Sequence, residues 1–194
     1  LKHLDLSGNA IGNLSALASI STLQTLVLAD NAVSDVKPLA GLTELTHLNL
    51  SENVLTDMAP LGACAKLTEL DVSDNKLTSI AAVQNMTALT SFRAEKNQLT
   101  DCAVLSLCTE LRTLDISHNQ LTDITMLSSL VKMAEFDFSY NQAAALPQLP
   151  NSAALVVIDG SYNLLSSLEP LNKLDALNYV YMDYNAEISK IAFL

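Results

Sequence analysis

The sequence predicts an α/β solenoid, in which a parallel β-sheet lines one side of a stack of short repeats and brief 3₁₀ or turn segments line the other. Two observations predict it: asparagine recurs every 22 residues, and each asparagine follows the same pattern of apolar residues. A fixed period of this length is typical of repeat proteins, whose units bury their apolar edges only by stacking. The repeated asparagines are Asn9, Asn31, Asn53, Asn75, Asn97, Asn119, Asn141, Asn163 and Asn185.

Each repeat is expected to begin with a short strand. When the repeated asparagine is numbered as position 9, positions 1, 4 and 6 are apolar in most repeats, as in Leu23, Leu26 and Leu28. Positions 3 to 6 alternate between polar and apolar residues, which predicts a strand with one buried face. The apolar columns at positions 11, 14, 17 and 20 are spaced by three and predict tight turns or a short 3₁₀ segment that returns the chain.

The asparagine column is expected to be structural. An amide at the point where the strand turns inward can pair with backbone groups, which need partners when they are buried. A hydroxyl residue followed by aspartate at positions 12 and 13 is expected to cap the turn of the return segment, with a metal site as the remote alternative. These pairs are Ser34-Asp35, Thr56-Asp57, Thr100-Asp101 and Thr122-Asp123.

The pattern L-x-x-L-x-L-x-x-N resembles that of the leucine-rich repeat family. Repeats two and three add S-D-V-x-P-L-x-x-L over Ser34–Leu42 and T-D-M-x-P-L over Thr56–Leu61. This version resembles the 22-residue repeats of bacterial internalins and the leucine-rich-repeat regulatory subunit of protein phosphatase-1. The resemblance covers the whole chain and implies a right-handed, curved solenoid, with the parallel sheet on the concave face and the short 3₁₀ or turn segments on the convex face. It says less about function, because such proteins share a scaffold and differ at exposed positions.

The chain is expected to be a single domain, residues 1–194, of nine repeats of about 22 residues. Neither end has the polar capping unit that keeps a solenoid soluble, so we expect a fragment that lacks its end caps. The lack of a visible signal peptide then says nothing about localisation. In the last repeat, one residue inserted after Asn185 restores the apolar frame. The residues that would then point inward are Ile188, Ile191 and Leu194.

Two other repeats depart from the pattern. Gly160 occupies a core column next to Phe138 of the preceding repeat, and we expect the large ring to compensate for the missing side chain. Repeat seven has a thinned return segment, residues 142–152, which contains Pro147 and Pro150.

The three cysteines fall in core columns. Cys64 and Cys108 are two repeats apart, or about 10 Å at the spacing of neighbouring strands, which exceeds the reach of a disulfide. Cys102 occupies a different column. All three are expected to be small buried apolar residues.

Composition limits the partners. The chain has 21 acidic and 10 basic residues, a formal net charge of −11. This balance argues against nucleic acid, which needs clustered Lys and Arg, and suits a basic partner. No apolar run reaches the roughly 20 residues that a membrane-spanning helix needs, so no membrane span is expected in this fragment.

Positions 3, 5 and 8 of the repeat are expected to be exposed. All five tyrosines occur there, in the last three repeats, whereas the phenylalanines fall in core columns. At position 5, three consecutive repeats carry aspartate, with carboxylates about 5 Å apart. Such neighbours repel by about 1–3 kcal/mol, and a sheet built only for stability would more naturally alternate charge. The candidate partner-binding residues are therefore Tyr140, Tyr162, Tyr179, Tyr181, Tyr184, Asp115, Asp137 and Asp159.

Tyrosine is a frequent interface hot spot. Beside a row of carboxylates it suits a partner that carries Lys or Arg, through cation–π and ion-pair contacts. The alternative is that the tyrosines pack against a missing C-terminal cap or form an unused face. A weaker basic group, Arg93, Lys96 and Arg112, is expected to pair with Glu95 and neighbouring aspartates.

An enzyme is not expected. Asp115, Ser117 and His118 are close in sequence, but consecutive strand residues face opposite ways and no further element closes over them, whereas nucleophilic catalysis needs an aligned base and an oxyanion site. Calcium at Asp137 and Asp159 is a lesser alternative, and no Cys/His spacing suggests zinc. We expect no cofactor and no small-molecule substrate.

The sequence thus predicts a protein–protein interaction module that binds a protein partner through the concave face, as part of a bacterial surface or secreted protein. The regular spacing and the D-x-x-P-L returns favour an extracellular or cell-surface location over the cytoplasm. The alternative is an intracellular regulatory subunit or scaffold that binds an enzyme such as a phosphatase. A purely structural array is a third possibility.

Overall fold

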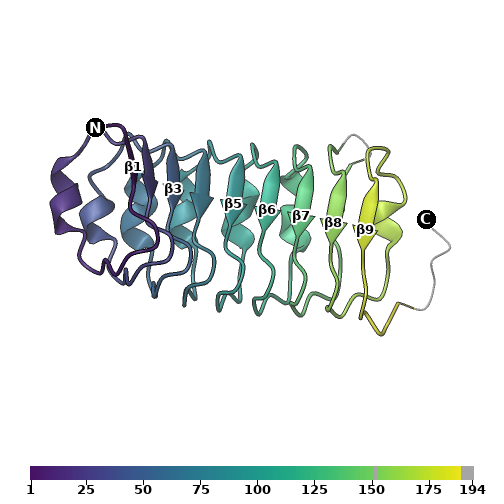
Figure 1. Ribbon diagram of the computed structural model, residues 1–194. Coiled ribbons are helices and arrows are strands. Elements are labelled where there is room, and N and C mark those ends of the chain that lie inside the picture. The colour runs from purple at the N-terminus through teal and green to yellow at the C-terminus, as the bar shows by residue number, and fades with distance from the viewer. Residues whose placement is uncertain (151–152, 189–194) are drawn as a thin grey trace.

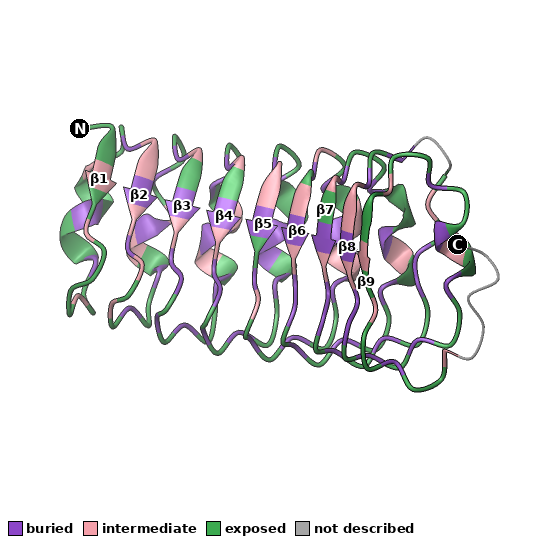
Figure 2. Cartoon of the chain, turned by 45° about the vertical axis from the view of Figure 1, so that its right-hand side comes forward, coloured by how far each residue is buried: buried purple, intermediate pink, exposed green. Residues whose placement is uncertain are grey.

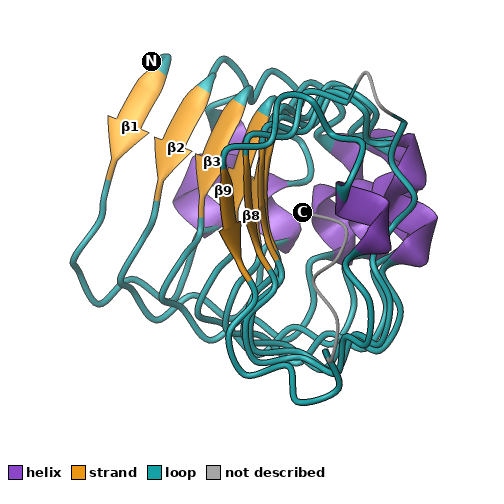
Figure 3. Ribbon diagram, turned by 90° about the vertical axis from the view of Figure 1, so that its right-hand side faces the viewer, coloured by secondary structure: helices purple, strands orange, loops and turns teal. Residues whose placement is uncertain are grey.

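The computed structural model describes residues 1–150 and 153–188, which form one continuous stack of repeats (Figure 1). Three-residue strands line one side of the stack and short 3₁₀ helices line the opposite side (Figure 3). The strands are β1 (His3–Asp5), β2 (Thr25–Val27), β3 (His47–Asn49), β4 (Glu69–Asp71), β5 (Ser91–Arg93), β6 (Thr113–Asp115), β7 (Glu135–Asp137), β8 (Val157–Asp159) and β9 (Tyr179–Tyr181). The 3₁₀ helices are η1 (Ser15–Ser19), η2 (Lys37–Leu39), η3 (Ala59–Ala63), η4 (Ala81–Asn85), η5 (Ala103–Leu107), η6 (Thr125–Ser129) and η7 (Glu169–Leu171).

The strands form one parallel sheet whose spatial order is the chain order, β1 to β9. Each strand pairs with the next at an offset of one repeat, so Leu4 lies opposite Leu26 and Leu26 opposite Leu48. Every column of the 22-residue pattern therefore becomes a straight row of side chains across the sheet. The predicted parallel sheet, with short 3₁₀ segments on the other side, is confirmed.

The core lies between the sheet and the 3₁₀ helices. The central residue of each strand from β2 to β8 is buried, whereas the residues on either side of it are exposed or half-buried (Figure 2). The return columns are buried as well, as in Val33, Val36, Leu39 and Leu42. Stacking thus buries the apolar positions that no single repeat could bury alone.

The asparagine column satisfies backbone groups of two repeats at once. The Nδ2 atom of Asn75 donates to the carbonyls of Val72 and Ser73 in its own repeat and to Leu50 in the preceding repeat, at 2.9–3.1 Å. Its Oδ1 accepts the backbone N–H of Leu55 at 2.9 Å. The same pattern recurs from Asn31 to Asn185. The predicted structural role of these asparagines is confirmed.

The aspartates at position 13 hold the first turn of the 3₁₀ helices. In four repeats the Oδ1 atom accepts the backbone N–H of the residue two positions later, at 2.8–2.9 Å, as predicted. The pairs are Asp35 with Lys37, Asp57 with Ala59, Asp101 with Ala103 and Asp123 with Thr125.

Position 8, just after each strand, has a left-handed backbone. Gly8 has φ of +66°, and the residues that replace glycine in later repeats have φ between +49° and +57°. This conformation costs an L-residue about 1–2 kcal/mol. The residues are Asp30, Glu52, Asp74, Lys96, His118, Tyr140, Tyr162 and Tyr184. The backbone is therefore constant at this position while the side chain varies.

The predicted exception at Gly160 is confirmed. A Cβ atom at Gly160 would lie 2.4 Å from Cζ of Phe138 and 2.9 Å from Sδ of Met182, so the ring occupies the space of the missing side chain. In repeat seven, the described part of the return segment contains no 3₁₀ helix, and Ala143 and Leu146 are its buried residues before Pro147.

The cysteines are buried and free. Burial raises the pKa of Cys102 to about 12 and that of Cys108 to about 11. These thiols are therefore unreactive, in line with the prediction of buried apolar residues. In the last repeat Ile188 packs against the core while Glu187 is exposed. Ile191 and Leu194 lie outside the described residues.

Candidate functional site

The exposed face of the sheet carries the side chains of positions 3 and 5. The predicted aspartates at position 5 lie in adjacent, in-register strands, with Asp115 opposite Asp137 and Asp137 opposite Asp159. We call these three residues the acidic ladder. The structure therefore brings together the three carboxylates that the sequence pattern placed in one row.

The acidic ladder also has a structural role that the sequence interpretation missed. The Oδ1 atom of Asp137 accepts the backbone N–H of Ser139 at 2.9 Å, and Asp115 and Asp159 accept from Ser117 and Ser161 in the same way, at 3.0 and 2.9 Å. Each bond closes the turn that leaves the strand. The signal was present in the sequence: six repeats pair Asp or Asn at position 5 with Ser at position 7, and the other three have neither.

This role uses one oxygen of each carboxylate. Among the described residues, the Oδ2 atoms of the acidic ladder accept no hydrogen bond and form no ion pair. Burial raises the pKa of Asp137, the N–H and hydroxyl of Ser139 oppose that rise, and the charges of Asp115 and Asp159 add to it. The ladder therefore presents three adjacent carboxylate oxygens that are free to bind a cation-bearing group.

The five tyrosines separate into two groups. Tyr179 and Tyr181 lie on β9 and are 52% and 48% exposed on the sheet face. Tyr140, Tyr162 and Tyr184 lie in the turn beyond the strands, at position 8. The sequence interpretation treated all five as one surface, whereas the structure places them on two neighbouring ones.

The tyrosines of the turn form a continuous stack with a histidine. The ring centroids of His118 and Tyr140 are 4.1 Å apart, those of Tyr140 and Tyr162 are 4.1 Å apart, and those of Tyr162 and Tyr184 are 4.2 Å apart, with interplanar angles of 11° to 17°. We call these four residues the aromatic ladder. The pKa of Tyr162 is raised well above its usual range. The largest cause is the hydrogen bond with the Tyr140 hydroxyl, and desolvation and a hydrogen bond with the Tyr184 hydroxyl add to it. The sequence signal for this stack was the spacing of 22 residues, which places these four rings in the turns that follow neighbouring strands.

A hollow of about 270 Å³ lies on the C-terminal part of the sheet face. All three aspartates of the acidic ladder line it, and so does Tyr181. The sequence interpretation did not include two further charged residues of its lining, Arg93 and Glu135. We call this feature the C-terminal hollow. Of the eight candidate residues, four therefore share one cavity, Tyr179 is on the strand beside it, and three tyrosines belong to the aromatic ladder.

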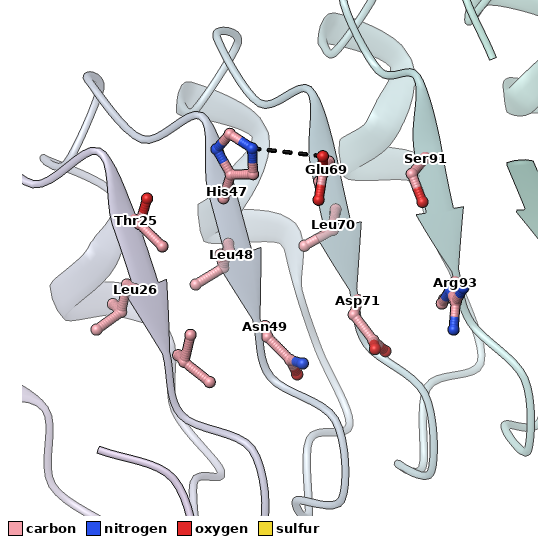
Figure 4. A pocket seen from close by; sticks show the side chains of 11 residues that line it. Thr25, Leu26, His47, Leu48, Asn49, Glu69, Leu70, Asp71, Ser91 and Arg93 are labelled. Carbon is pink, nitrogen blue, oxygen red and sulfur yellow. Dashed lines mark ion pairs between the residues drawn. The ribbon is translucent and has the colours of Figure 1, made fainter. Parts of the chain in front are cut away.

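A second hollow, of about 360 Å³, lies on the N-terminal part of the same face, over β2 to β5 (Figure 4). We call it the N-terminal hollow. Figure 4 shows His47 pointing toward Glu69, and His47 Nε2 lies 3.4 Å from Glu69 Oε1. Asp71 and Arg93 also line it, so Arg93 belongs to both hollows. The sequence pattern does not predict a site in the exposed columns of repeats two to four.

Of the basic residues of repeats five and six, Lys96 pairs with a neighbouring aspartate as expected. Lys96 Nζ lies 3.5 Å from Asp74 Oδ2. Arg93 lies in register between Asp71 and Asp115. Within residues 1–150 and 153–188 neither Arg93 nor Arg112 forms an ion pair within 4 Å. Within that part of the chain the predicted pairing with Glu95 and the neighbouring aspartates is therefore wrong for Arg93 and Arg112.

The residues weighed for catalysis do not assemble. The Ser117 hydroxyl donates to Asp115 Oδ1 at 2.7 Å, whereas the His118 ring stacks on Tyr140. The described residues contain no group of three or more His, Cys, Asp or Glu side chains placed to hold a metal ion. No helix among these residues is long and apolar enough to span a membrane.

Comparison with known families identifies the repeat. The family model described as Leucine Rich repeats (2 copies) matches residues 21–63, and the model described as Leucine Rich repeat matches residues 1–18, 63–83 and 107–124. None of the curated proteins matches the chain by sequence.

Solved structures give the same assignment. An internalin, InlF, from Listeria monocytogenes is 25% identical, with a TM-score of 0.87 over 93% of this chain and 54% of its own. Internalin C2 from the same organism is 26% identical, with a TM-score of 0.88 over 93% of this chain and 80% of its own.

A plant protein has the same fold. The ectodomain of the receptor kinase GASSHO1/SCHENGEN3 from Arabidopsis thaliana, solved in complex with CASPARIAN STRIP INTEGRITY FACTOR 2, is 27% identical, with a TM-score of 0.82 over 94% of this chain and 24% of its own. The chain thus spans about half the length of InlF and about a quarter of the plant ectodomain. It is a leucine-rich repeat protein, and its repeats resemble those of the internalins.

Proposed function

We propose that this chain is a non-enzymatic binding module that captures a basic protein partner on the exposed face of its sheet, centred on the C-terminal hollow. The observation that carries the proposal is the acidic ladder, whose three in-register carboxylates each have one oxygen without a partner among the described residues. Lys or Arg side chains of a partner would bind these oxygens, and Tyr181 would add cation–π and apolar contact.

Three further features support this function. The burial and mutual repulsion of the ladder's carboxylates raise the pKa of Asp137, which a bound cation would reverse. The net charge of −11 favours encounter with a basic partner. The plant ectodomain was solved in complex with a protein factor, and we infer a protein or peptide ligand for this chain by analogy.

The wider setting is also a proposal. The likeness to internalins supports a role in a bacterial surface or secreted protein. The alternative of an intracellular regulatory subunit that binds an enzyme such as a phosphatase stays a prediction. Nucleic acid and small-molecule substrates do not suit an acidic, open face of this kind.

A displayed library of random 12-residue peptides tests the function. Peptides selected on the natural chain are expected to be enriched in Lys and Arg. Their affinity should fall at least about tenfold when Asp115, Asp137 and Asp159 are all changed to Asn, since ion pairs with three free carboxylates are lost. The Asn substitution keeps the turn, because Asn49 makes the same bond to the N–H of Ser51 at 2.8 Å.

Asp5→Asn is the matched control, because Asp5 makes the same turn outside the hollow. Its affinity change should stay within about twofold. Selection of no binders, of peptides without cationic residues, or of binders that ignore the triple substitution would each contradict the proposed function. Tyr181→Ala should weaken binding by about tenfold if the ring is a hot spot.

A further inference from the structure

The two hollows lie next to each other along the exposed face of the sheet. The N-terminal hollow is lined by β2 to β5 and the C-terminal hollow by β5 to β9, and the two share Arg93. Each has its own acidic residues at position 5, Asp71 in one and the acidic ladder in the other. Between them the acidic row is interrupted at Arg93.

Arg93 makes this interruption a barrier to cations. It replaces the Asp or Asn that closes the turn in six other repeats, and among the described residues it has no ion pair within 4 Å. A cationic side chain of a ligand is repelled there, whereas a neutral or acidic one is tolerated or attracted. The exposed face of the sheet therefore offers two cation subsites with a break between them.

The geometry sets the distance between these subsites. Asp71 on β4 and Asp137 on β7 are three strand intervals apart, which is about 14 Å at the spacing of neighbouring strands. An extended chain advances about 3.3 Å per residue, so four residues cover this distance and the side chains at both ends point to the same face. An α-helix would need about nine residues for the same span.

Building on the proposed function, we propose that the ligand is an extended segment of polypeptide that lies across the strands, with two Lys or Arg residues four positions apart. One cation binds at Glu69 and Asp71 in the N-terminal hollow, and the other binds at the acidic ladder. The residue midway between them lies between β5 and β6, beside Arg93, and is neutral or acidic. Arg93 is thus the residue that determines the spacing.

Three synthetic peptides of identical composition test this inference. Each is acetylated, amidated, built on Gly, Ser and Thr, and carries two Arg residues that are adjacent, four positions apart or nine positions apart. Binding is measured by fluorescence anisotropy at low ionic strength, where charge contacts are least screened. Because all three have the same charge, general attraction to an acidic protein cancels. The peptide whose two Arg residues are four positions apart is expected to bind about tenfold more tightly than the peptide whose two Arg residues are adjacent.

The variant Arg93→Asn should reduce this preference to about twofold and strengthen binding of the adjacent pair, because the break in the acidic row is removed. Asn occurs at the same position in repeat three, as Asn49, and an unchanged unfolding transition would show that the variant is folded. Asp71→Asn should weaken the binding only of the peptide whose two Arg residues are four positions apart.

The two proposals fail in different ways. Equal affinity of the three peptides, or tightest binding at a spacing of nine, overturns the extended segment with its spacing of four while leaving the acidic face as a binding site. So does a ligand that binds only as a folded domain. If no cationic peptide binds and the Asn substitutions in the acidic ladder change nothing, the proposed function itself is wrong.

Discussion

Asp5 on β1 and Asp137 on β7 occupy the same position of the repeat and make the same turn, yet their pKa values shift in opposite directions. The hydroxyl and N–H of Ser7 lower the pKa of Asp5. Burial raises the pKa of Asp137 against the same kind of bonds, and the neighbouring Asp115 and Asp159 contribute to the rise. Asp5 is exposed and has Val27 as its neighbour in register.

This difference separates scaffold from function. The turn itself favours a carboxylate, as Asp5 shows, so an isolated aspartate at position 5 is accounted for by the fold. In the middle of the row of three, burial and the two neighbouring charges raise the pKa of Asp137. Asn49 shows that asparagine closes the same turn without charge. The charge of the acidic ladder is therefore more than the fold requires, and this excess distinguishes the C-terminal half of the face.

The largest expected effect is one that the two halves share. Asn75→Ala and Asn141→Ala should each cost about 3 kcal/mol of unfolding free energy, because each leaves several buried backbone groups of two repeats without partners. Denaturant unfolding measures the loss, and peptide binding should be unaffected under conditions where the variants are folded. A cost at Asn141 far below that at Asn75 would mean that the halves also differ in scaffold.

The core of the C-terminal half should tolerate a small side chain poorly at one point. Gly160→Ala places a methyl group against Phe138 and Met182 and should cost about 2 kcal/mol through overpacking. In Gly41→Ala the new Cβ has nothing within 4 Å, so its change should stay within about 0.5 kcal/mol. Equal effects of the two substitutions in thermal unfolding would contradict the packing at Gly160.

The aromatic ladder should contribute modestly to stability. Tyr162→Ala loses stacking on two sides, at 4.1 and 4.2 Å, and should cost about 1–2 kcal/mol. Glu52→Ala removes a side chain from the same left-handed backbone position without a stack and should be nearly neutral. A Tyr162 effect no larger than that of Glu52 would show that stacking contributes no stability.

The same residue predicts a dependence on high pH. The pKa of Tyr162 is raised in the folded chain, so the unfolded chain ionises first. Stability associated with this hydroxyl is complete below the unfolded pKa of about 10 and is lost as pH rises above it. Between pH 9 and pH 11 the melting temperature of the natural chain should fall more steeply than that of Tyr162→Phe.

The smallest expected effects distinguish Asp5 from Asp137. At pH 7, Asp137→Asn should raise the melting temperature, since a carboxylate with a raised pKa is ionised at a cost. Asp5→Asn should lower it, since the lowered pKa of Asp5 means that its charge stabilises the fold. The Asp137 difference should fade as pH falls through its raised pKa toward the unfolded value of about 4, whereas the Asp5 difference should fade only below about 4, as pH falls through its lowered pKa. Changes of the same sign at pH 7 would remove the contrast.

The repeat pattern predicted most of the fold because its signal was repeated nine times. The register of the sheet, the buried columns, the bonds of the asparagines and the clash at Gly160 all follow from aligning the chain on one residue type. The pair that closes the turn, as in Asp137 and Ser139, is repeated in six of the nine repeats, but the aspartates were interpreted only as exposed charge. A side chain can be exposed and structural at once, and the column pattern alone does not separate the two roles.

The candidate site was predicted only in part. A column of the repeat pattern predicts which residues form one row across the sheet, but it does not predict which of these rows line the same cavity. The aspartates and Tyr181 share the C-terminal hollow, whereas Tyr162 belongs to a stack three positions further along its repeat. The lack of an ion pair at Arg93 among the described residues depends on side-chain positions that no one-dimensional pattern contains.

The asparagine bonds give the solenoid a mechanical polarity. Each amide completes its own repeat and the one before it, as Asn53 does by bonding Leu28 and Val33, and never the one after. When a force removes the last repeat from the C-terminal end, the repeat before it loses the asparagine that paired with its backbone groups. When a force removes the first repeat from the N-terminal end, the asparagine of the following repeat keeps its bonds within its own repeat. The force needed to unfold successive repeats should therefore follow a different profile when unfolding starts at the C-terminal end than when it starts at the N-terminal end.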